Sequence, residues 1–530
     1  MSRPGPGGEQ PPWWVGAAGY EVYLRSFADG DGDGVGDLRG LRDRLAHLAW
    51  LGVDFVWITP FYPSPMADHG YDITDHTDVD PRYGTLADID AVIDEAHRLG
   101  LRVVIDLVPN HTSDQHPWFR ASRSDPTGPF GDWYHWHPGR GGDEAPNNWR
   151  SYFGGSAWSR DPERGAWYCH LFLPQQPDLN WATPAVADAF DEILRFWLRR
   201  GVDGFRVDVA QGLAKDPAYR DNPPAAMPTP GPGPRAEWGG QEHRYDIAQP
   251  GALAVFRRWH EGVADSGALL LGEVYLPEPA EVAPYVAGDG LDVAFSFAFA
   301  SLRWDAEEVR QALRSTLIHL GERACWTQTS HDEPRPPTRF GGGARGQARA
   351  RAVTTLLAGM PGLFVLYQGE ELGLEDATVP AERAQDPLGD RDGCRTPLPW
   401  SNDPPGWGFT TASDSWLPVG DRQAGDTVAA QRGNPRSALH LHRRLLEVRR
   451  RIRPDAPVRW VGAGPVVAYA RGDHQVAAAI DDAPLTHDPG PGTWRVVLST
   501  DPDRELGPTG PLTLAPAEAV VLERSAAEGG

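Results

Sequence analysis

The stretch GVDGFRVDVA, residues 201–210, places charged side chains inside an otherwise apolar run. Because side chains alternate across a β-strand, Arg206 and Asp208 lie on one face of the predicted strand. The opposite face is apolar and consists of Phe205, Val207 and Val209. Burying an unpaired charge costs several kcal/mol or more. We therefore expect Arg206 and Asp208 to line a cavity and to pair there.

Two further acids, Glu273 and Asp332, and two histidines, His111 and His331, also stand at the ends of short apolar runs. Neighbouring strands of a sheet lie about 4.8 Å apart. Asp208 and Glu273 can therefore approach to about 5–5.5 Å, where one carboxylate can attack an anomeric carbon while the other transfers protons. Arg206 would keep Asp208 ionised. The alternative is that these acids form structural ion pairs.

The elements that position these residues alternate regularly along the chain. Helical patterns separate the β-type runs, and Thr183-Pro184 provides an N-cap and a first turn for a helix that stops at Gly201. The predicted strands are residues 20–27, 53–60, 101–111, 201–210, 268–275, 291–299, 325–332 and 362–371. Such alternation predicts a parallel, closed (β/α)8 barrel, whose catalytic groups project from the carboxyl ends of its strands.

Two segments do not follow the barrel pattern. Residues 111–175, after the third predicted strand, are aromatic and irregular with no clean helix, which predicts an insert lobe over the barrel mouth. From residue 451 to 530, short apolar runs without helices predict a C-terminal antiparallel β-sandwich. The barrel domain would then comprise 1–110 and 176–450. The Pro/Gly-rich residues 222–237 are expected to form a loop.

The composition limits the classes of partner. The chain has 530 residues and a formal charge of -23, which argues against nucleic acid and anionic membrane surfaces. Its cysteines, Cys169, Cys325 and Cys394, are far apart and odd in number, which indicates a reducing compartment without a disulfide framework. We find no signal peptide and no apolar stretch of transmembrane length. We expect a cytoplasmic, soluble protein that binds a small molecule.

An acidic loop, DGDGDGVGDLRG at residues 29–40, has the spacing of a calcium-binding loop. The candidate ligands are Asp29, Asp31, Asp33, the Val35 carbonyl and Asp37. Gly40 stands where such loops have a bidentate glutamate. Four carboxylates within nine residues repel one another unless a cation bridges them. We expect a structural Ca²⁺ here, and the alternative is a solvated acidic turn.

Five motifs together resemble the α-amylase superfamily, whose members are retaining enzymes that cleave α-glucosides. Four of them are similar to its signature regions: DLVPNH (106–111), GFRVDVA (204–210), LLGEVY (270–275) and SHDEPR (330–335). The fifth, QPDLNW (176–181), resembles a region of the α-glucosidase and oligo-1,6-glucosidase branch. The motifs occur in order and on the predicted strands, so the resemblance covers nearly the whole chain.

The resemblance implies a role for each acid. Asp208 would be the nucleophile, Glu273 the general acid/base, and Asp332 the second carboxylate that fixes the distorted sugar. It also assigns hydrogen bonds with the glucose at subsite −1, the site of the cleaved residue, to His111, Arg206 and His331.

The resemblance also implies how the pocket is closed. DHGYDITD (68–75) is similar to a barrel loop in which Tyr71 stacks under the −1 glucose. Asp68 and Arg391 match a pair that closes the pocket around the non-reducing end, which implies exo action on short chains. The alternative for this pair is a surface salt bridge.

The sequence departs from the family pattern at Ser330, where the family usually has asparagine. By strand alternation Ser330 should point away from His331, so we expect a supporting effect and no loss of activity. Val209, after the predicted nucleophile, is typical of α-1,6 cleavage, whereas AQGLAKD (210–216) resembles enzymes that favour α-1,4 substrates. The linkage preference stays open.

These observations predict a retaining, exo-acting α-glucosidase of short α-glucosides that needs no organic cofactor. One alternative is a glucosyltransferase or isomerase of the same superfamily, similar to trehalose synthase, in which a sugar replaces water as the acceptor. Another is a catalytically silent sugar-binding protein. The presence of Asp208 and Glu273 argues against this last alternative.

Overall fold

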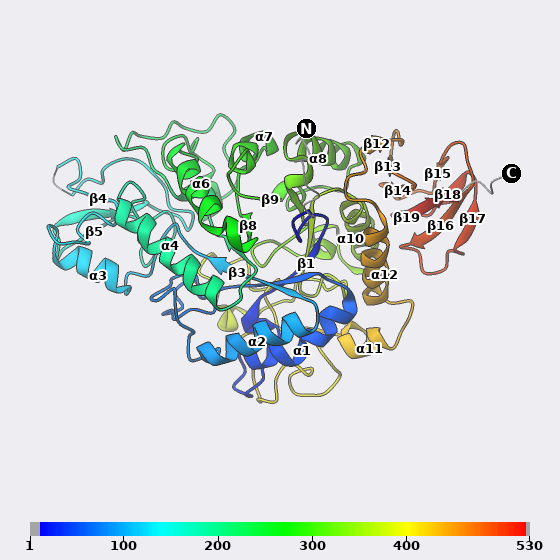
Figure 1. Ribbon diagram of the computed structural model, residues 1–530, viewed down its shortest axis with the longest axis horizontal. Helices are drawn as coiled ribbons and strands as arrows, with labels where there is room; N and C mark the ends of the chain where they lie inside the picture. The colour runs from blue at the N-terminus through cyan, green and yellow to red at the C-terminus, as the bar shows by residue number, and fades with distance from the viewer. Residues whose placement is uncertain (1–10, 142, 526–530) are drawn as a thin grey trace.

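A closed barrel of parallel strands forms the centre of the protein (Figure 1). The computed structural model describes residues 11–141 and 143–525. Around the barrel the strands follow the order β1-β11-β10-β9-β8-β7-β3-β2. They are β1 (Ala18–Val22), β2 (Phe55–Ile58), β3 (Arg102–Leu107), β7 (Gly204–Val207), β8 (Leu269–Gly272), β9 (Val293–Ser296), β10 (Ala324–Trp326) and β11 (Leu363–Tyr367). The predicted (β/α)8 barrel is confirmed.

Helices surround the barrel and bury their apolar faces against it. They include α1 (Leu38–Leu51), α2 (Leu86–Arg98), α4 (Pro184–Arg199), α6 (Gly251–Val263), α7 (Pro279–Val282), α8 (Ala306–His319), α9 (Pro336–Arg339), α10 (Gly343–Ala358), α11 (Val428–Arg432) and α12 (Ala438–Arg451). The α4 helix begins at Pro184 as predicted, but the Thr183 side chain does not cap it. Its hydroxyl donates to the carbonyl of Asp132 instead. Thr183 therefore links the start of α4 to the loop that contains Asp132.

Several strands end earlier than the sequence predicts, and this changes how the residues after them are placed. The β7 strand ends at Val207, and Val209 adopts a left-handed backbone conformation with φ 44°. Val209 is therefore not part of the apolar strand face. The β10 strand ends at Trp326, so Ser330 and Asp332 lie in a loop. Strand alternation does not determine the direction of Ser330.

The segment after β3 forms a small lobe at one end of the longest axis (Figure 1). An antiparallel sheet in the order β4-β6-β5 lies there, made of β4 (Trp136–His137), β5 (Trp158–Asp161) and β6 (Ala166–Cys169). The expectation of no clean helix is wrong, because α3 (Pro117–Ser124) starts where His116 accepts a hydrogen bond from the Trp118 amide. In the Pro/Gly-rich stretch, α5 (Pro234–Trp238) likewise adds a short helix.

The C-terminal region lies at the other end of the longest axis (Figure 1). Its larger antiparallel sheet has the order β12-β13-β14-β19-β16-β17, and β15 pairs with β18 in a smaller sheet. The strands are β12 (Val458–Trp460), β13 (Val466–Arg471), β14 (His474–Ala479), β15 (Leu485–His487), β16 (Trp494–Ser499), β17 (Gly507–Thr509), β18 (Leu512–Leu514) and β19 (Ala519–Arg524). The predicted antiparallel β domain is confirmed. The predicted domain boundaries stay predictions.

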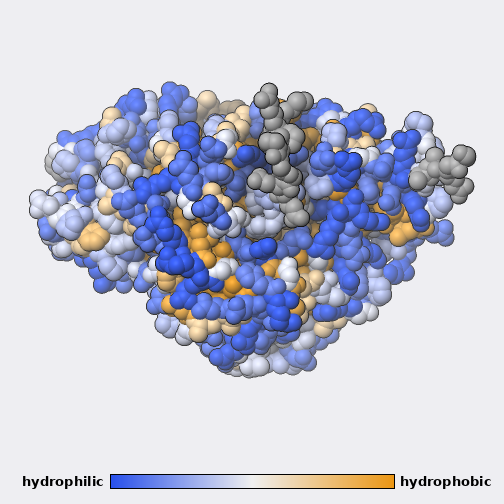
Figure 2. Space-filling view, in the orientation of Figure 1, coloured by the Kyte–Doolittle hydropathy of each residue, from blue (hydrophilic) through white to orange (hydrophobic). Residues whose placement is uncertain are grey.

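Most of the surface seen in Figure 2 is hydrophilic, and hydrophobic residues gather near the middle of this face, around the barrel. Among the helices of the described residues, none combines the length and the apolarity that a membrane crossing requires.

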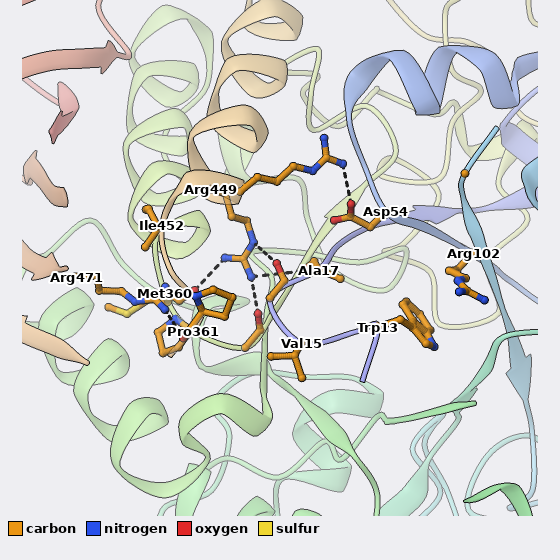
Figure 3. Close-up of a pocket in the computed structure, with 15 residues that line it drawn as sticks. Trp13, Val15, Ala17, Asp54, Arg102, Met360, Pro361, Arg449, Ile452 and Arg471 are labelled. Atoms are coloured by element: carbon orange, nitrogen blue, oxygen red, sulfur yellow. Dashed lines mark hydrogen bonds and ion pairs between the residues drawn. The ribbon is translucent and has the colours of Figure 1, made fainter. Parts of the chain in front are cut away.

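At the amino end of the barrel, Arg449 of α12 reaches the backbone that enters the strands (Figure 3). Its Nη1 donates to the carbonyls of Ala358 (2.6 Å) and Met360 (2.9 Å), and its Nη2 donates to those of Ala17 and Gly362. Burial lowers the pKa of this guanidinium to about 10. Because carbonyl oxygens surround it, Arg449 satisfies backbone acceptors that would otherwise be buried without partners.

Replacing Arg449 by alanine should lower the free energy of unfolding by about 3 kcal/mol or more, because several buried carbonyls lose their donor. Arg450→Ala is the matched control: Arg450 is half exposed and pairs with Asp54 at 2.7 Å, so its loss should cost less than about 1 kcal/mol. Urea unfolding and thermal melting of both variants measure the difference. Equal effects would contradict this role of Arg449.

Candidate active site

Two acids leave the barrel side by side at the carboxyl ends of adjacent strands. The β7 and β8 strands are parallel neighbours, and Val207 pairs in register with Gly272. Asp208 and Glu273 directly follow the two strands. Because neighbouring strands lie about 4.8 Å apart, the two carboxylates emerge together above the barrel.

Arg206 links these acids to a third one below them. Its Nη1 lies 2.6 Å from Asp208 Oδ1 and 2.7 Å from Asp106 Oδ1, and its Nη2 lies 2.7 Å from Glu273 Oε1. The Arg206 guanidinium also lies over the ring of Trp57, 4.9 Å from its centroid. The predicted pairing of Arg206 with Asp208 is therefore present. It is one contact of a cluster in which a single guanidinium orients three carboxylates.

The charges of this cluster do not balance. Burial raises the pKa of Asp208 well above its usual range; Arg206 opposes this shift, whereas repulsion from Glu273 and Asp106 adds to it. Burial also raises the pKa of Asp106 to about 6. The expectation that Arg206 alone keeps Asp208 ionised is therefore too simple, because one cation faces three carboxyl groups.

A backbone amide fixes the second oxygen of Glu273. The amide of Val209 donates to Glu273 Oε2 at 2.9 Å, while Oε1 contacts Arg206. The left-handed conformation of Val209, with φ 44° and ψ 46°, turns this amide toward β8. A β-branched residue rarely adopts this conformation, so the surrounding structure must hold it. The strained turn after β7 thus positions the carboxyl group on β8.

His331 is held from below by a buried acid. Its Nδ1 lies 2.6 Å from Glu21 Oε1, and its Nε2 lies 3.0 Å from the Tyr71 hydroxyl. The rings of Tyr71 and His331 stack with centroids 5.5 Å apart and an angle of 11°. Burial lowers the pKa of His331 to about 3 and raises that of Glu21 well above its usual range. A neutral imidazole held in this way orients the Tyr71 hydroxyl, so His331 supports the site from behind, whereas the sequence resemblance assigns it a direct hydrogen bond to the sugar.

Asp332 lies between two arginines, six residues beyond the end of β10. Its Oδ1 is 2.8 Å from Arg391 Nη1 and 2.6 Å from Arg395 Nη2. Burial by itself would raise the pKa of Asp332, but His331, Arg391 and Arg395 outweigh burial and hold it well below its usual range. Asp332 is therefore ionised at neutral pH. Its backbone amide donates to the hydroxyl of Ser330 at 3.2 Å.

The Asp68–Arg391 pair is present and buried. Arg391 Nη2 lies 3.1 Å from Asp68 Oδ1, and the two residues are 8% and 6% exposed. Gln176 Nε2 links Asp68 Oδ2 to His111 Nε2, at 3.1 Å from each. Asp386 contacts the same nitrogen: its Oδ1 lies 2.7 Å from Arg391 Nη2. The alternative of a surface salt bridge is therefore wrong.

These groups surround a cavity of 470 Å³ at the carboxyl end of the barrel. Its lining includes the predicted residues Asp68, Tyr71, His111, Asp208, Glu273, Asp332 and Arg391. Ser330 and Val209 line it as well. Arg206 and His331 are each only 1% exposed, so they support the lining from behind. A negatively lined cavity of this size suits a neutral, hydroxyl-rich ligand.

Sequence reasoning missed five residues of this network, namely Glu21, Asp106, Gln176, Asp386 and Arg395. For Glu21 and Asp106 a signal existed, because each is a charge inside an apolar strand, as Arg206 is. Asp106 even pairs in register with Arg206. Asp386 and Arg395 lie in long loops, and no local pattern indicates them.

The acidic loop gathers part of its predicted ligand set. Carboxylate oxygens of Asp29, Asp31 and Asp37 lie within 4.8 Å of one another, a spacing that fits a cation. Asp33 is not in this group: its Oδ1 accepts the Val35 amide at 2.8 Å. Of the four predicted carboxylates, those of Asp29, Asp31 and Asp37 therefore come together, whereas the Val35 carbonyl stays a prediction. Asp37 also caps α1.

None of the three cysteines lines this cavity. All of them are buried, and within the described part of the chain they are unpaired, as expected. Burial raises the pKa of the Cys394 thiol above its usual range, which disfavours the reactive thiolate.

Comparisons with known proteins agree with the geometry. A model of the α-amylase catalytic domain matches residues 21–454. A probable α-glucosidase of Rhizobium meliloti (strain 1021) is 43% identical over 459 residues, which cover 83% of this chain and 82% of the relative. An oligo-1,6-glucosidase of Parageobacillus thermoglucosidasius is 36% identical over 481 residues, with 83% and 84% covered.

A solved structure is similar over nearly its whole length. The α-glucosyl transfer enzyme XgtA matches with a TM-score of 0.90 and 37% identity, covering 97% of this chain and 100% of the other. The resemblance found in the sequence motifs is thus confirmed by a family model, by relatives and by the fold. The chain belongs to the α-amylase family and is a glycoside hydrolase.

Proposed function

We propose that this protein is a retaining, exo-acting α-glucosidase that releases glucose from the non-reducing ends of short α-glucosides such as maltose and malto-oligosaccharides. One observation carries the proposal: Asp208 and Glu273 contact adjacent nitrogens of the same guanidinium, on neighbouring strands. Two carboxyl groups this close suit a nucleophile and an acid/base that act on one anomeric carbon.

In this mechanism Glu273 donates a proton to the glycosidic oxygen while Asp208 attacks C1. The bond from C1 to the leaving oxygen breaks, and a β-glucosyl ester of Asp208 forms. Glu273 then takes a proton from water, which attacks C1 and regenerates the Asp208 carboxylate. The Val209 amide would hold Glu273 within reach of the glycosidic oxygen in the first step and of the attacking water in the second.

The remaining lining residues would bind the glucose itself. Asp332, held ionised by Arg391 and Arg395, can accept hydrogen bonds from two sugar hydroxyls. Tyr71 would offer a ring face to the sugar, and the buried Asp68–Arg391 pair would close the cavity around its non-reducing end. A closed end admits only a chain terminus, which supports exo action. Hydrolysis of this kind needs no organic cofactor.

A glucosyl-transferring or isomerising reaction is the second candidate. The similarity to XgtA, named as an α-glucosyl transfer enzyme, favours it. Both candidates share the ester on Asp208 and differ in whether water or a sugar resolves it. The relatives named α-glucosidase and oligo-1,6-glucosidase leave the linkage open as well. The cytoplasmic location expected from the sequence stays a prediction.

A product assay tests the proposed function. With maltose, isomaltose, sucrose, trehalose and starch as substrates, we expect glucose as the main product of the short α-glucosides and little action on starch. Trehalose or longer oligomers from maltose would favour transfer. Asp208→Asn should lower kcat by about 10³-fold or more while sugar binding persists. The control Asp90→Asn, at a half-exposed ion pair with Arg200, should keep full activity; equal rates of the two variants would refute the mechanism.

The pH profile tests the charge cluster. Repulsion from Asp106 raises the pKa of Asp208, so Asp106→Asn should lower it. Because the nucleophile must be ionised, the acidic limb of kcat/KM should move to lower pH in this variant, whatever its absolute rate. Kinetics with an aryl α-glucoside from pH 4 to 8 measure the limb. A limb that stays in place or moves to higher pH would contradict the coupling.

We also propose that the acidic loop holds a structural Ca²⁺ through Asp29, Asp31 and Asp37. The ion would neutralise clustered carboxylates next to α1 and supply no chemistry to the cavity. Dialysis against EDTA should lower the melting temperature and Ca²⁺ should restore it, since a ligand at 100 times its Kd stabilises by about 2.7 kcal/mol. Asp31→Asn should weaken this response, whereas Asp43→Asn on α1 should retain it. A melting temperature that does not depend on Ca²⁺ would contradict the proposed site and support the alternative of a solvated acidic turn.

A further inference from the structure

A cavity separate from the catalytic one lies at the amino end of the barrel (Figure 3). It has a volume of 350 Å³ and is formed where the amino ends of β1, β2, β3 and β11 meet α12 and the end of β13. We call it the basal pocket, and its lining includes Trp13, Asp54, Arg102, Arg449, Arg450 and Arg471. Among the described residues, none lines both the basal pocket and the catalytic cavity. The proposed hydrolysis therefore makes no use of it.

Positive charge dominates the basal pocket, although the chain as a whole has a formal charge of -23. Its lining holds four arginines and one carboxylate. Arg450 Nη2 lies 2.7 Å from Asp54 Oδ1, and the other oxygen of Asp54 accepts a backbone amide at 2.8 Å. Arg102 Nη1 lies 2.6 Å from Oδ1 of Asp203, which stands outside the lining. Two of the four arginines are thus paired, each with one carboxylate.

The other two arginines are buried away from carboxylates. Arg449 and Arg471 are 6% and 4% exposed, and within the described part of the chain no carboxylate oxygen lies within 4.0 Å of either guanidinium. Like Arg449, Arg471 donates to carbonyls, from Nη1 to Gly359 at 2.9 Å and from Nη2 to Pro454 at 2.7 Å. Carbonyl oxygens satisfy these donors but carry no net charge. The lining therefore holds two positive charges that no carboxylate balances, and burial strengthens their field in the pocket.

The two paired arginines keep donors for a ligand. Arg450 contacts Asp54 and the carbonyl of Gly52 only through Nη2, and Arg102 contacts Asp203 only through Nη1. Among the described residues, Nε and Nη1 of Arg450 and Nε and Nη2 of Arg102 have no hydrogen-bond partner. Both side chains are 49% exposed. Their free N–H groups can therefore donate to an anionic oxygen that enters the pocket.

Apolar surface lines another part of the basal pocket. Trp13 is held in place, since its Nε1 donates to the carbonyl of Gly267 at 3.2 Å and its ring meets Phe55 edge-on with centroids 5.8 Å apart. The Arg102 guanidinium lies 5.7 Å from the centre of the same indole ring. Aliphatic groups add to this surface, namely Val15, Met360, Pro361 and Ile452. A ligand with an anionic part and a small organic part matches these surroundings.

We propose that the basal pocket binds a phosphate monoester, with the phosphate at the arginines and its small organic group against Trp13 and the aliphatic side chains. A phosphate monoester carries a charge of about −1.5 to −2 at pH 7, which matches the two unbalanced guanidiniums, whereas a carboxylate carries only one charge. The volume of 350 Å³ lies in the range of small-molecule sites, about 300–1,000 Å³. This binding site is additional to the proposed hydrolysis and does not depend on it.

Isothermal titration calorimetry of the full-length protein tests the proposal with phenyl phosphate, inorganic phosphate and phenol. Phenyl phosphate should bind about fivefold or more tightly than inorganic phosphate, because its ring adds apolar contact area. It should bind about tenfold or more tightly than phenol, which lacks the charge. No binding of phenyl phosphate, or an affinity no higher than that of either other probe, would overturn the proposal and leave the arginines a structural role alone.

Two variants locate the binding. Arg450→Ala should weaken phenyl phosphate binding about tenfold or more, because charge-assisted hydrogen bonds are lost. Arg102→Ala, on β3, should also weaken it and serves as the test if Arg450→Ala does not fold. Arg451→Ala is the matched control on α12, since its side chain is also 49% exposed, pairs with Glu523 at 3.6 Å and stands outside the lining. Wild-type affinity in both pocket variants, or an equal loss in the control, would refute the site.

Activity separates this site from the proposed function. Neither Arg102 nor Arg450 lines the catalytic cavity, so both variants should hydrolyse maltose at the wild-type rate in phosphate-free buffer. A wild-type protein that binds phenyl phosphate but hydrolyses no short α-glucoside would refute the proposed function and support the basal pocket. Hydrolysis without binding of phenyl phosphate would refute only the basal pocket.

Discussion

The arrangement of the catalytic cavity depends on the Arg206 guanidinium. Three carboxylates converge on it, and two of them stand at the positions where a nucleophile and an acid/base would act. Without the arginine, buried carboxylates at this spacing would repel one another unless they took up protons. With it, each carboxylate has a fixed direction. The planar shape of guanidinium suits this role, because its nitrogens can hold different oxygens at set angles.

The same principle recurs around the other polar groups of the site. Glu21 holds His331 from below, and Arg391 and Arg395 hold Asp332 from the side. Glu21 lies on β1, whereas Arg391 and Arg395 lie in the long segment after β11. The barrel brings them together because the carboxyl ends of all its strands meet at one rim. The charged groups stabilise one arrangement of the rim, and in that arrangement Asp208, Glu273 and Asp332 line one cavity.

The lining of the cavity is mixed in character. The Asp68–Arg391 ion pair is part of it, whereas Tyr275 and Phe297 contribute aromatic rings. This difference follows from which loops carry charged residues and which carry aromatic residues.

Much of the fold could be predicted from the sequence. Strand and helix periodicities are local, so the barrel, its order of elements and the residues at its strand ends were readable, as were the motifs around Asp208 and Glu273. The charge in an apolar strand, Arg206, correctly indicated its pairing with Asp208, but Arg206 lies behind the cavity lining that it was expected to form. Glu21 and Asp106 are also charged residues in apolar strands, but their partners can be identified only when their neighbours in space are known.

Other features were decided by the tertiary structure. Three features depend on what each segment packs against. These are the left-handed turn at Val209, the end of β10 at Trp326, and the close approach of the Asp29, Asp31 and Asp37 carboxylates in the acidic loop. Asp386 and Arg395 reach the site only because long loops fold back over the barrel. Local sequence determines which groups are available and which backbone conformations are low in energy. Long-range packing and charge pairing determine which of those groups meet, because their energies depend on distances that the order of residues does not contain.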